Sequence, residues 1–139
     1  MTKEIDARVL EAFEKVRKKF LFSDVEFKRA IEFPDLTIIA CKGKIGSLIG
    51  RKGIIVAELS KALDSKVRLV EHSKNPRKVV SDIIGNARLL GISETFSPQG
   101  RSIIVRLNQD DKKKLLTKPD SLESAIEQLT EAKTRIEFG

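Results

Sequence analysis

The sequence predicts an α+β fold made of two copies of one unit, each with the order helix, strand, strand, helix, helix, strand. Segments of helical periodicity alternate with short β-branched segments along the 139-residue chain. A turn signal, His72-Ser73-Lys74-Asn75-Pro76, divides the chain into residues 1–73 and 74–139. When the halves are overlaid, the apolar positions of residues 36–62 coincide with those of residues 103–129. We therefore expect two tandem modules of the same α+β fold.

In the first half, apolar spacing predicts the helices and β-branched runs predict the strands. Residues 3–20 carry one amphipathic stripe: Ile5, Val9, Leu10, Phe13, Val16 and Phe20. Pro34-Asp35 separates two apolar strands, and Ile55, Leu59 and Ala62 mark one face of a later helix. The expected elements are helix 3–20, strands 24–33 and 35–42, a helical turn at 44–49, helix 54–63 and strand 66–72.

In the second half, capping residues place the helices. Asn75 is a predicted helix cap with Pro76 in the first turn, and Gly91 is the predicted stop. Asp120 and Glu123 have the spacing of a capping box. The expected elements are helix 76–90, strands 92–96 and 101–107, a basic helical segment at 110–116, helix 121–133 and strand 134–138.

Composition limits the classes of function. The net charge is +7, and residues 42–68 hold seven basic residues against Glu58 and Asp64, which suggests a polyanionic partner. No apolar run is long enough to span a bilayer, and the N-terminus lacks the apolar region of a signal peptide. We expect a cytoplasmic protein with no membrane partner. With Cys41 and His72 as the only cysteine and histidine, we expect no disulfide, metal site or cofactor.

The glycines cluster inside the basic segment. Four of the eight, Gly43, Gly46, Gly50 and Gly53, fall within residues 43–53. Glycine lets a partner approach the backbone closely, and a helix that starts after Gly53 favours an anion at its positive end. The spacing fits neither an ATP or GTP phosphate loop nor a dinucleotide loop. A nucleic-acid backbone is the remaining phosphate ligand.

The stretch Leu48-Ile-Gly-Arg-Lys-Gly-Ile-Ile-Val-Ala-Glu-Leu59 resembles the signature of KH-domain RNA-binding proteins. The matched positions are Leu48, Ile49, Gly50, Gly53, Val56 and Leu59. The resemblance implies two tandem type II KH-like modules, each with helices packed on one face of a small mixed three-stranded sheet. It also implies that the Gly-x-x-Gly loop clamps single-stranded RNA by its backbone. Carried over residue by residue, it implies an RNA-binding set made of Lys44, Gly46, Gly50, Arg51, Lys52, Gly53, Ile54 and Arg68.

Two such modules at this length resemble the archaeal NusA-like transcription factors. That resemblance implies a role in transcription elongation or termination on nascent RNA, with RNA polymerase or other transcription and RNA-processing proteins as partners. A KH adaptor in RNA processing or on the ribosome is the alternative. The second half departs from the pattern, because Thr117-Lys118-Pro119-Asp120 occupies the position of the Gly-x-x-Gly loop.

The second half therefore has weaker signals for RNA binding. Pro119 removes an N–H and Asp120 adds a negative charge where an anion would lie, so we expect a packing or protein-docking module. Lys112, Lys113 and Lys114 could supply auxiliary salt-sensitive contacts, weakened by Asp110 and Asp111 beside them. An enzyme is not expected, since one histidine in a strand end and one cysteine in an apolar strand cannot form a catalytic set.

Overall fold

The chain divides into two compact units, Met1–His72 and Ser73–Gly139. The computed structural model describes residues 2–20, 25–43 and 52–139, and each unit is described here by itself. Each unit pairs two helices with a three-stranded sheet in which one strand pair is antiparallel and the other parallel. The predicted α+β class is confirmed, and this arrangement is consistent with two tandem KH-like modules. The helical turn expected at 44–49 lies outside the described residues.

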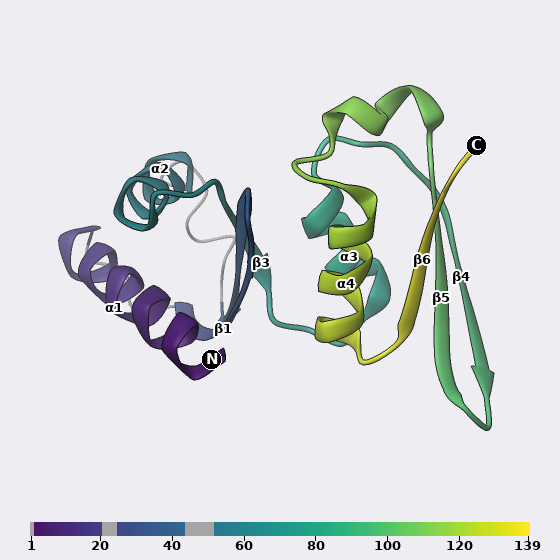
Figure 1. Ribbon diagram of the computed structural model, residues 1–139, viewed down its shortest axis with the longest axis horizontal. Coiled ribbons are helices and arrows are strands. Elements are labelled where there is room, and N and C mark those ends of the chain that lie inside the picture. The colour runs from purple at the N-terminus through teal and green to yellow at the C-terminus, as the bar shows by residue number, and fades with distance from the viewer. Residues whose placement is uncertain (1, 21–24, 44–51) are drawn as a thin grey trace. The chain divides into compact units, whose positions relative to one another are not determined.

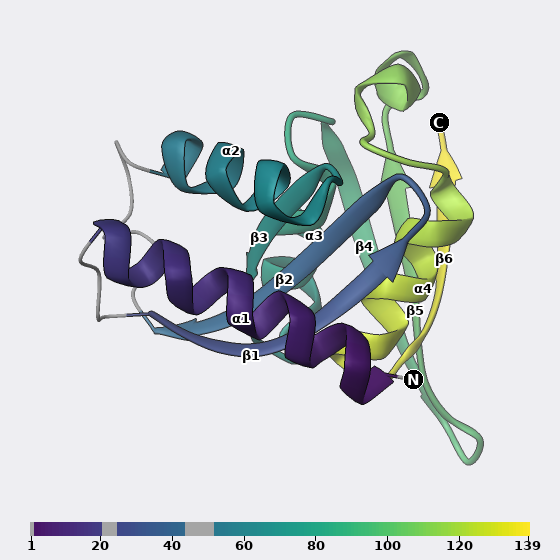
Figure 2. The same ribbon diagram turned by 60° about the vertical axis from the view of Figure 1, so that its left-hand side comes forward.

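The first unit places two helices on one face of its sheet (Figure 2). Its elements are α1 (Thr2–Phe20), β1 (Val25–Phe33), β2 (Leu36–Gly43), α2 (Lys52–Leu63) and β3 (Val67–Glu71). β2 lies in the middle, antiparallel to β1 and parallel to β3. A register shift between Phe27 and Arg29 in β1 explains the break in alternation that the sequence shows there.

The core of the first unit lies between α1, α2 and the sheet. α1 contributes Val9, Ala12, Phe13 and Val16, and α2 contributes Ile55, Leu59 and Leu63. Two predictions of inward residues were wrong: Leu10 is 41% exposed and Ala62 is exposed. In α2 the buried residues are spaced four apart, so Leu63 rather than Ala62 continues the stripe.

The second unit repeats this plan with its own sheet (Figure 1). Its elements are α3 (Pro76–Ile84), β4 (Leu89–Ser97), β5 (Gly100–Leu107), the 3₁₀ helix η2 (Gln109–Lys114), α4 (Pro119–Thr130) and β6 (Lys133–Phe138). β5 is central, antiparallel to β4 and parallel to β6. Buried apolar side chains on β5 alternate with more exposed ones, as expected for a sheet covered by helices on one face.

The start of α3 agrees with the sequence and its end does not. The Asn75 side chain accepts a hydrogen bond from the Arg77 N–H at 3.0 Å, and Pro76 follows in the first turn. The prediction that the helix runs to residue 90 was wrong, because α3 ends at Ile84. Gly85 follows with φ 62°, a backbone conformation that favours glycine. β4 then begins at Leu89, so Leu90 lies in a strand and is 52% exposed.

The predicted capping box at the start of α4 is also wrong. The residue at the cap is Lys118, which makes no side-chain capping hydrogen bond, and Pro119 occupies the first turn. Glu123 instead reaches across to β6, where its carboxylate accepts a hydrogen bond from the Ile136 N–H at 2.7 Å. Glu123 therefore makes a tertiary contact with β6 in place of the capping contact that the local pattern predicts.

Candidate nucleic-acid interface

The described part of the predicted RNA-binding set lies at the start of α2 and on β3. Lys44, Gly46, Gly50 and Arg51 lie outside the described residues. Lys52 is the first residue of α2 and Gly53 the second, so the motif leads directly into this helix. The prediction that a helix follows the loop is therefore confirmed, with the helix starting two residues earlier than residue 54.

The start of α2 is a favourable position for an anion. Its first turn holds no acidic residue that would neutralise the positive end of the helix dipole. The first N–H groups of a helix also have no partner within the helix and can bind an oxygen ligand. The backbone therefore supplies donors where the motif places Arg51 and Lys52.

Gly53 has no internal reason to be glycine. A Cβ placed on it would meet nothing within 4 Å. Gly53 is also absent from the residues with positive φ, among which are Gly43, Gly85 and Gly100. Inside a helix, glycine costs about 0.5–1 kcal/mol relative to alanine. Neither packing nor backbone conformation requires glycine at this position. An exposed glycine of this kind is expected where a partner approaches the backbone closely.

The next two residues have opposite environments. Ile54 is 53% exposed, whereas Ile55 is 0% exposed and belongs to the core between α1, α2 and the sheet. Among the large hydrophobic side chains of the described chain, Ile54 is one of four exposed ones; the others are Leu10, Leu90 and Phe96. An exposed aliphatic side chain beside the cationic loop is suited to contact a base.

Arg68 is not brought together with this helix start. It lies in β3 between Val67 and Leu69, which pack in the core under α1 and α2. Since side chains alternate across a strand, Arg68 lies on the other face of the sheet. Its neighbour on β2 in the register is Ile38. The structure therefore separates Arg68 from Gly53 and Ile54, which share one helix turn.

The corresponding helix start in the second unit differs in both charge and donors. α4 begins at Pro119, which has no N–H, and its first turn contains Asp120. Asp120 is exposed, so its negative charge stands at the positive end of the helix. The Asp120 carboxylate already offsets the positive end of the α4 dipole, so this helix start is a poorer anion site than the start of α2.

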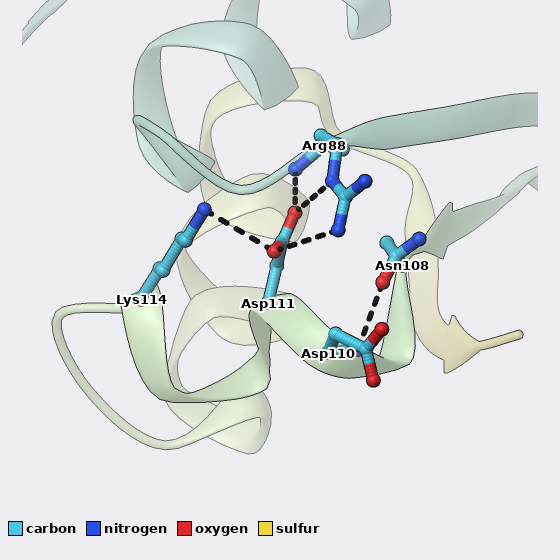
Figure 3. Close-up of polar contacts among 5 residues, drawn as sticks. All are labelled: Arg88, Asn108, Asp110, Asp111 and Lys114. Atoms are coloured by element: carbon cyan, nitrogen blue, oxygen red, sulfur yellow. Dashed lines mark hydrogen bonds and ion pairs between the residues drawn. The ribbon is translucent and has the colours of Figure 1, made fainter.

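An ion-pair cluster around the buried carboxylate of Asp111 in the second unit was not predicted from the sequence (Figure 3). Asp111 is 2% exposed and accepts hydrogen bonds from the backbone N–H of Arg88 at 2.7 Å and from its Nε at 2.9 Å. The Lys114 ammonium lies 3.3 Å from the same carboxylate. Hydrogen bonds from the Arg88 side chain and backbone hold the pKa of the Asp111 carboxyl well below its usual range.

This cluster corrects the reading of the lysine run beside it. From the sequence, Asp110 and Asp111 were both expected to weaken the contacts that Lys112, Lys113 and Lys114 make with phosphate. In the structure the Asp111 charge is buried and compensated by Arg88, so it does not weaken the surface charge of Lys112 and Lys113, which are exposed. Arg88 and Asp111 are 23 residues apart, and no local pattern reveals such a pair.

Cys41, the cysteine of the chain, is buried in the first unit. Burial raises the pKa of the Cys41 thiol to about 12, so it stays protonated at neutral pH. Within residues 2–20, 25–43 and 52–139, no three His, Cys, Asp or Glu side chains gather as metal ligands. None of the helices in these ranges is both long and apolar enough to cross a membrane.

Comparison with known proteins supports the fold. The crystal structure of APE1850 is similar over 100% of both chains, with a TM-score of 0.68 and 18% sequence identity. At this identity the likeness concerns the fold alone. No protein-family model matches the chain, and no curated protein matches it.

Proposed function

We propose that this protein binds single-stranded RNA at the start of α2, in the manner of a KH domain. The observation that carries the proposal is the pairing of an open glycine with an exposed isoleucine there. Gly53 meets no atom that would exclude a side chain, and Ile54 is 53% exposed. A chain shaped only for folding would favour alanine over glycine at the first position.

Each residue of the motif then has a role in binding RNA. Gly50 and Gly53 let the sugar-phosphate backbone approach, while Arg51 and Lys52 neutralise phosphates next to the free N–H groups of α2. Lys44 and Gly46 precede the loop in the sequence and would border the same sugar-phosphate backbone. Arg68 is left out of the proposed site because it lies on the opposite face of the sheet from α2.

Base contacts in this site would be aliphatic. The protein has no tryptophan or tyrosine, and none of its seven phenylalanines lies within residues 42–68. Ring stacking, which supports many single-strand binders, is therefore unavailable from this segment. Ile54 is the described apolar side chain best placed to pack against a base.

Charge reversal with a matched control tests the site. We expect Arg51→Glu with Lys52→Glu to abolish binding of a fluorescein-labelled single-stranded RNA, measured by anisotropy at about 0.1 M salt, where exposed charges act over roughly 10 Å. The control, Lys61→Glu with Lys66→Glu, makes the same change in net charge within the same basic segment, at two exposed positions. Equal losses in both variants would show that net charge, not the loop, binds the RNA.

We further propose that the bound RNA is a nascent transcript and that the protein acts in transcription elongation or termination. The support is the presence of two units of the same fold in one short chain, as in the NusA-like factors that the motif resembles. Affinity purification from the native cell tests this role. Co-purified RNA polymerase subunits would support it, whereas nucleases or ribosomal proteins would favour the adaptor role.

A further inference from the structure

The sheet of the second unit has one face that the helices of this unit do not cover. Figure 1 shows α3 and α4 together on one side of β4, β5 and β6. Three β5 side chains are buried on the helix side: Ile103, Val105 and Leu107. Because side chains alternate along a strand, the residues between them lie on the other side, the open face: Ser102, Ile104 and Arg106.

The strand register extends the open face over all three strands, since paired residues of neighbouring strands share a face of the sheet. Arg106 pairs with Gly91 on β4 and with Glu137 on β6. The register shift in β4 lies between Leu89 and Gly91, so it does not affect the rows that follow. Those two rows run across the sheet as Ser93–Ile104–Arg135 and Thr95–Ser102–Lys133.

The open face is cationic. It carries Arg106, Lys133 and Arg135, which are all exposed, against one acidic residue, Glu137. Glu137 lies 2.8 Å from Arg135 in an ion pair. Arg106 and Lys133 have no ion pair with any residue that the structure describes. Two uncompensated positive charges thus remain on this face for an anionic ligand.

The other carboxylates near this sheet are engaged away from the open face. Glu94 is in register with the buried Ile103, on the helix side, and lies 2.7 Å from Arg101. Glu123 and Glu127 of α4 accept hydrogen bonds from N–H groups of β6, at 2.7 Å and 3.2 Å. These acidic groups therefore do not pair with the two free cations of the open face.

Gly91 leaves an open space beside Arg106. A Cβ placed on Gly91 would meet nothing within 4 Å, and Gly91 is not among the glycines with positive φ. The bulge next to it therefore does not require glycine. Glycine weakens the interior of a strand and often marks a place where a ligand approaches the backbone closely. A guanidinium beside such a space is a platform for a base, since RNA bases stack on arginine as well as on aromatic rings.

We infer that the open face is a second RNA-binding surface, on which a base stacks on Arg106 over Gly91 while Lys133 and Arg135 bind phosphates. The hydroxyl groups of the two rows add hydrogen bonds to sugar and phosphate oxygens. Ile104 is the one large apolar side chain on this face and is half-buried. An acidic protein would find no apolar core for an interface here, so RNA is the polyanion that fits better.

This role rests on the RNA site proposed at the start of α2. Only residues 72–75 join β3 to α3, so the two units stay close to each other along the chain. A strand of RNA that is held at α2 and is long enough to reach the open face binds there at a high effective concentration. The second surface therefore contributes mainly to the binding of longer RNA.

RNA length separates the two surfaces experimentally. A KH clamp holds about four nucleotides, so a random-sequence RNA of about 6 nucleotides occupies one surface at a time, whereas one of about 20 can reach both. We expect Arg106→Gln with Lys133→Gln to weaken binding of the longer RNA at least about tenfold and of the shorter RNA less than about twofold. Fluorescence anisotropy with labelled RNA at about 0.1 M salt measures both affinities.

The matched control is Arg77→Gln with Lys118→Gln. It also removes one arginine and one lysine charge from the second unit, at exposed positions outside the open face. We expect this control to change neither affinity by more than about twofold. An equal loss in the control and in the open-face variant would show that net charge binds the longer RNA and would overturn the inference.

Gly91→Thr tests the space beside Arg106 without a change in charge. Threonine suits a strand and its Cβ meets nothing within 4 Å, so we expect an unchanged or higher melting temperature. We expect the longer RNA to bind at least about fivefold more weakly, because the side chain fills the place of the base. Binding as tight as in the wild type would overturn the stacking on Arg106.

Two further outcomes would overturn the inference. One is unchanged binding of the longer RNA by the variant with Arg106→Gln and Lys133→Gln. The other is competition for this surface by polyglutamate of matched charge as effective as that by unlabelled RNA. Failure of the α2 site is detected separately, because Arg51→Glu with Lys52→Glu would then leave the affinity for the shorter RNA unchanged.

Discussion

Ile54 and Ile55 are neighbours in α2, and their opposite environments allow binding and folding to be separated by single substitutions. Ile55 is 0% exposed and packs in the core of the first unit, whereas Ile54 is 53% exposed. Truncating a fully buried isoleucine to alanine costs about 2–5 kcal/mol. For Ile54, burial of a whole side chain is worth about 1.5–3 kcal/mol, and roughly half of the side chain is already exposed, so the cost is at most about 1.5 kcal/mol.

We therefore expect Ile55→Ala to lower the free energy of unfolding by about 2–5 kcal/mol and Ile54→Ala to lower it by at most about 1.5 kcal/mol. The order reverses for RNA. Losing the contact of half an isoleucine with a base, about 1 kcal/mol, weakens binding about fivefold in Ile54→Ala. Ile55→Ala, measured at a temperature where it remains folded, binds as the wild type does.

Urea unfolding followed by circular dichroism measures the stabilities, because the chain has no tryptophan or tyrosine for fluorescence. Anisotropy with labelled single-stranded RNA measures the affinities. If Ile54→Ala were as destabilising as Ile55→Ala, the assignment of Ile54 to the surface would be wrong. If Ile54→Ala bound RNA with unchanged affinity, its role in base contact would be refuted while its exposure stood.

Three further predictions follow from individual contacts. Gly53→Ala is expected to raise the free energy of unfolding by about 0.5–1 kcal/mol, since a Cβ meets nothing within 4 Å among the described residues. The same change is expected to reduce RNA affinity. A thermal melt and an RNA-binding titration decide whether the glycine is needed for binding. Asp111→Asn is expected to lower the melting temperature. The pKa of Asp111 is lower in the folded protein than in the unfolded chain. Its contribution to stability is therefore present above the unfolded pKa of about 3.9 and is lost as the pH falls from there through the folded pKa. The melting temperatures of the wild type and of Asp111→Asn should converge in acid, and a constant difference between them would contradict the pairing with Arg88. Glu123→Gln is expected to speed amide exchange at Ile136, whose N–H it accepts, and unchanged protection would show that this contact contributes nothing.

Most element types followed from local pattern, and the errors occurred where distant residues decide. The two units and their order of elements were predicted because β-branched runs, helical stripes and the turn before Asn75 are local signals, whereas the mixed sheets were implied by the resemblance to KH domains. The end of α3 was misplaced because helical periodicity continues past Gly85, whose positive φ stops the helix. The capping box failed because Glu123 bonds to β6 rather than to its own helix.

The sequence by itself determined the class of fold, the duplication and the position of the cationic glycine motif before α2. These features depend on residue types and spacings within one segment, so local physics specifies them. Only the tertiary structure decided that Leu63 rather than Ala62 packs in the core, and that Arg68 lies on the face of its sheet away from α2. It also revealed that Asp111 is compensated by Arg88 and that two carboxylates of α4, those of Glu123 and Glu127, accept hydrogen bonds from N–H groups of β6. Such facts depend on which distant groups the fold brings together, and spacing along the chain does not encode them.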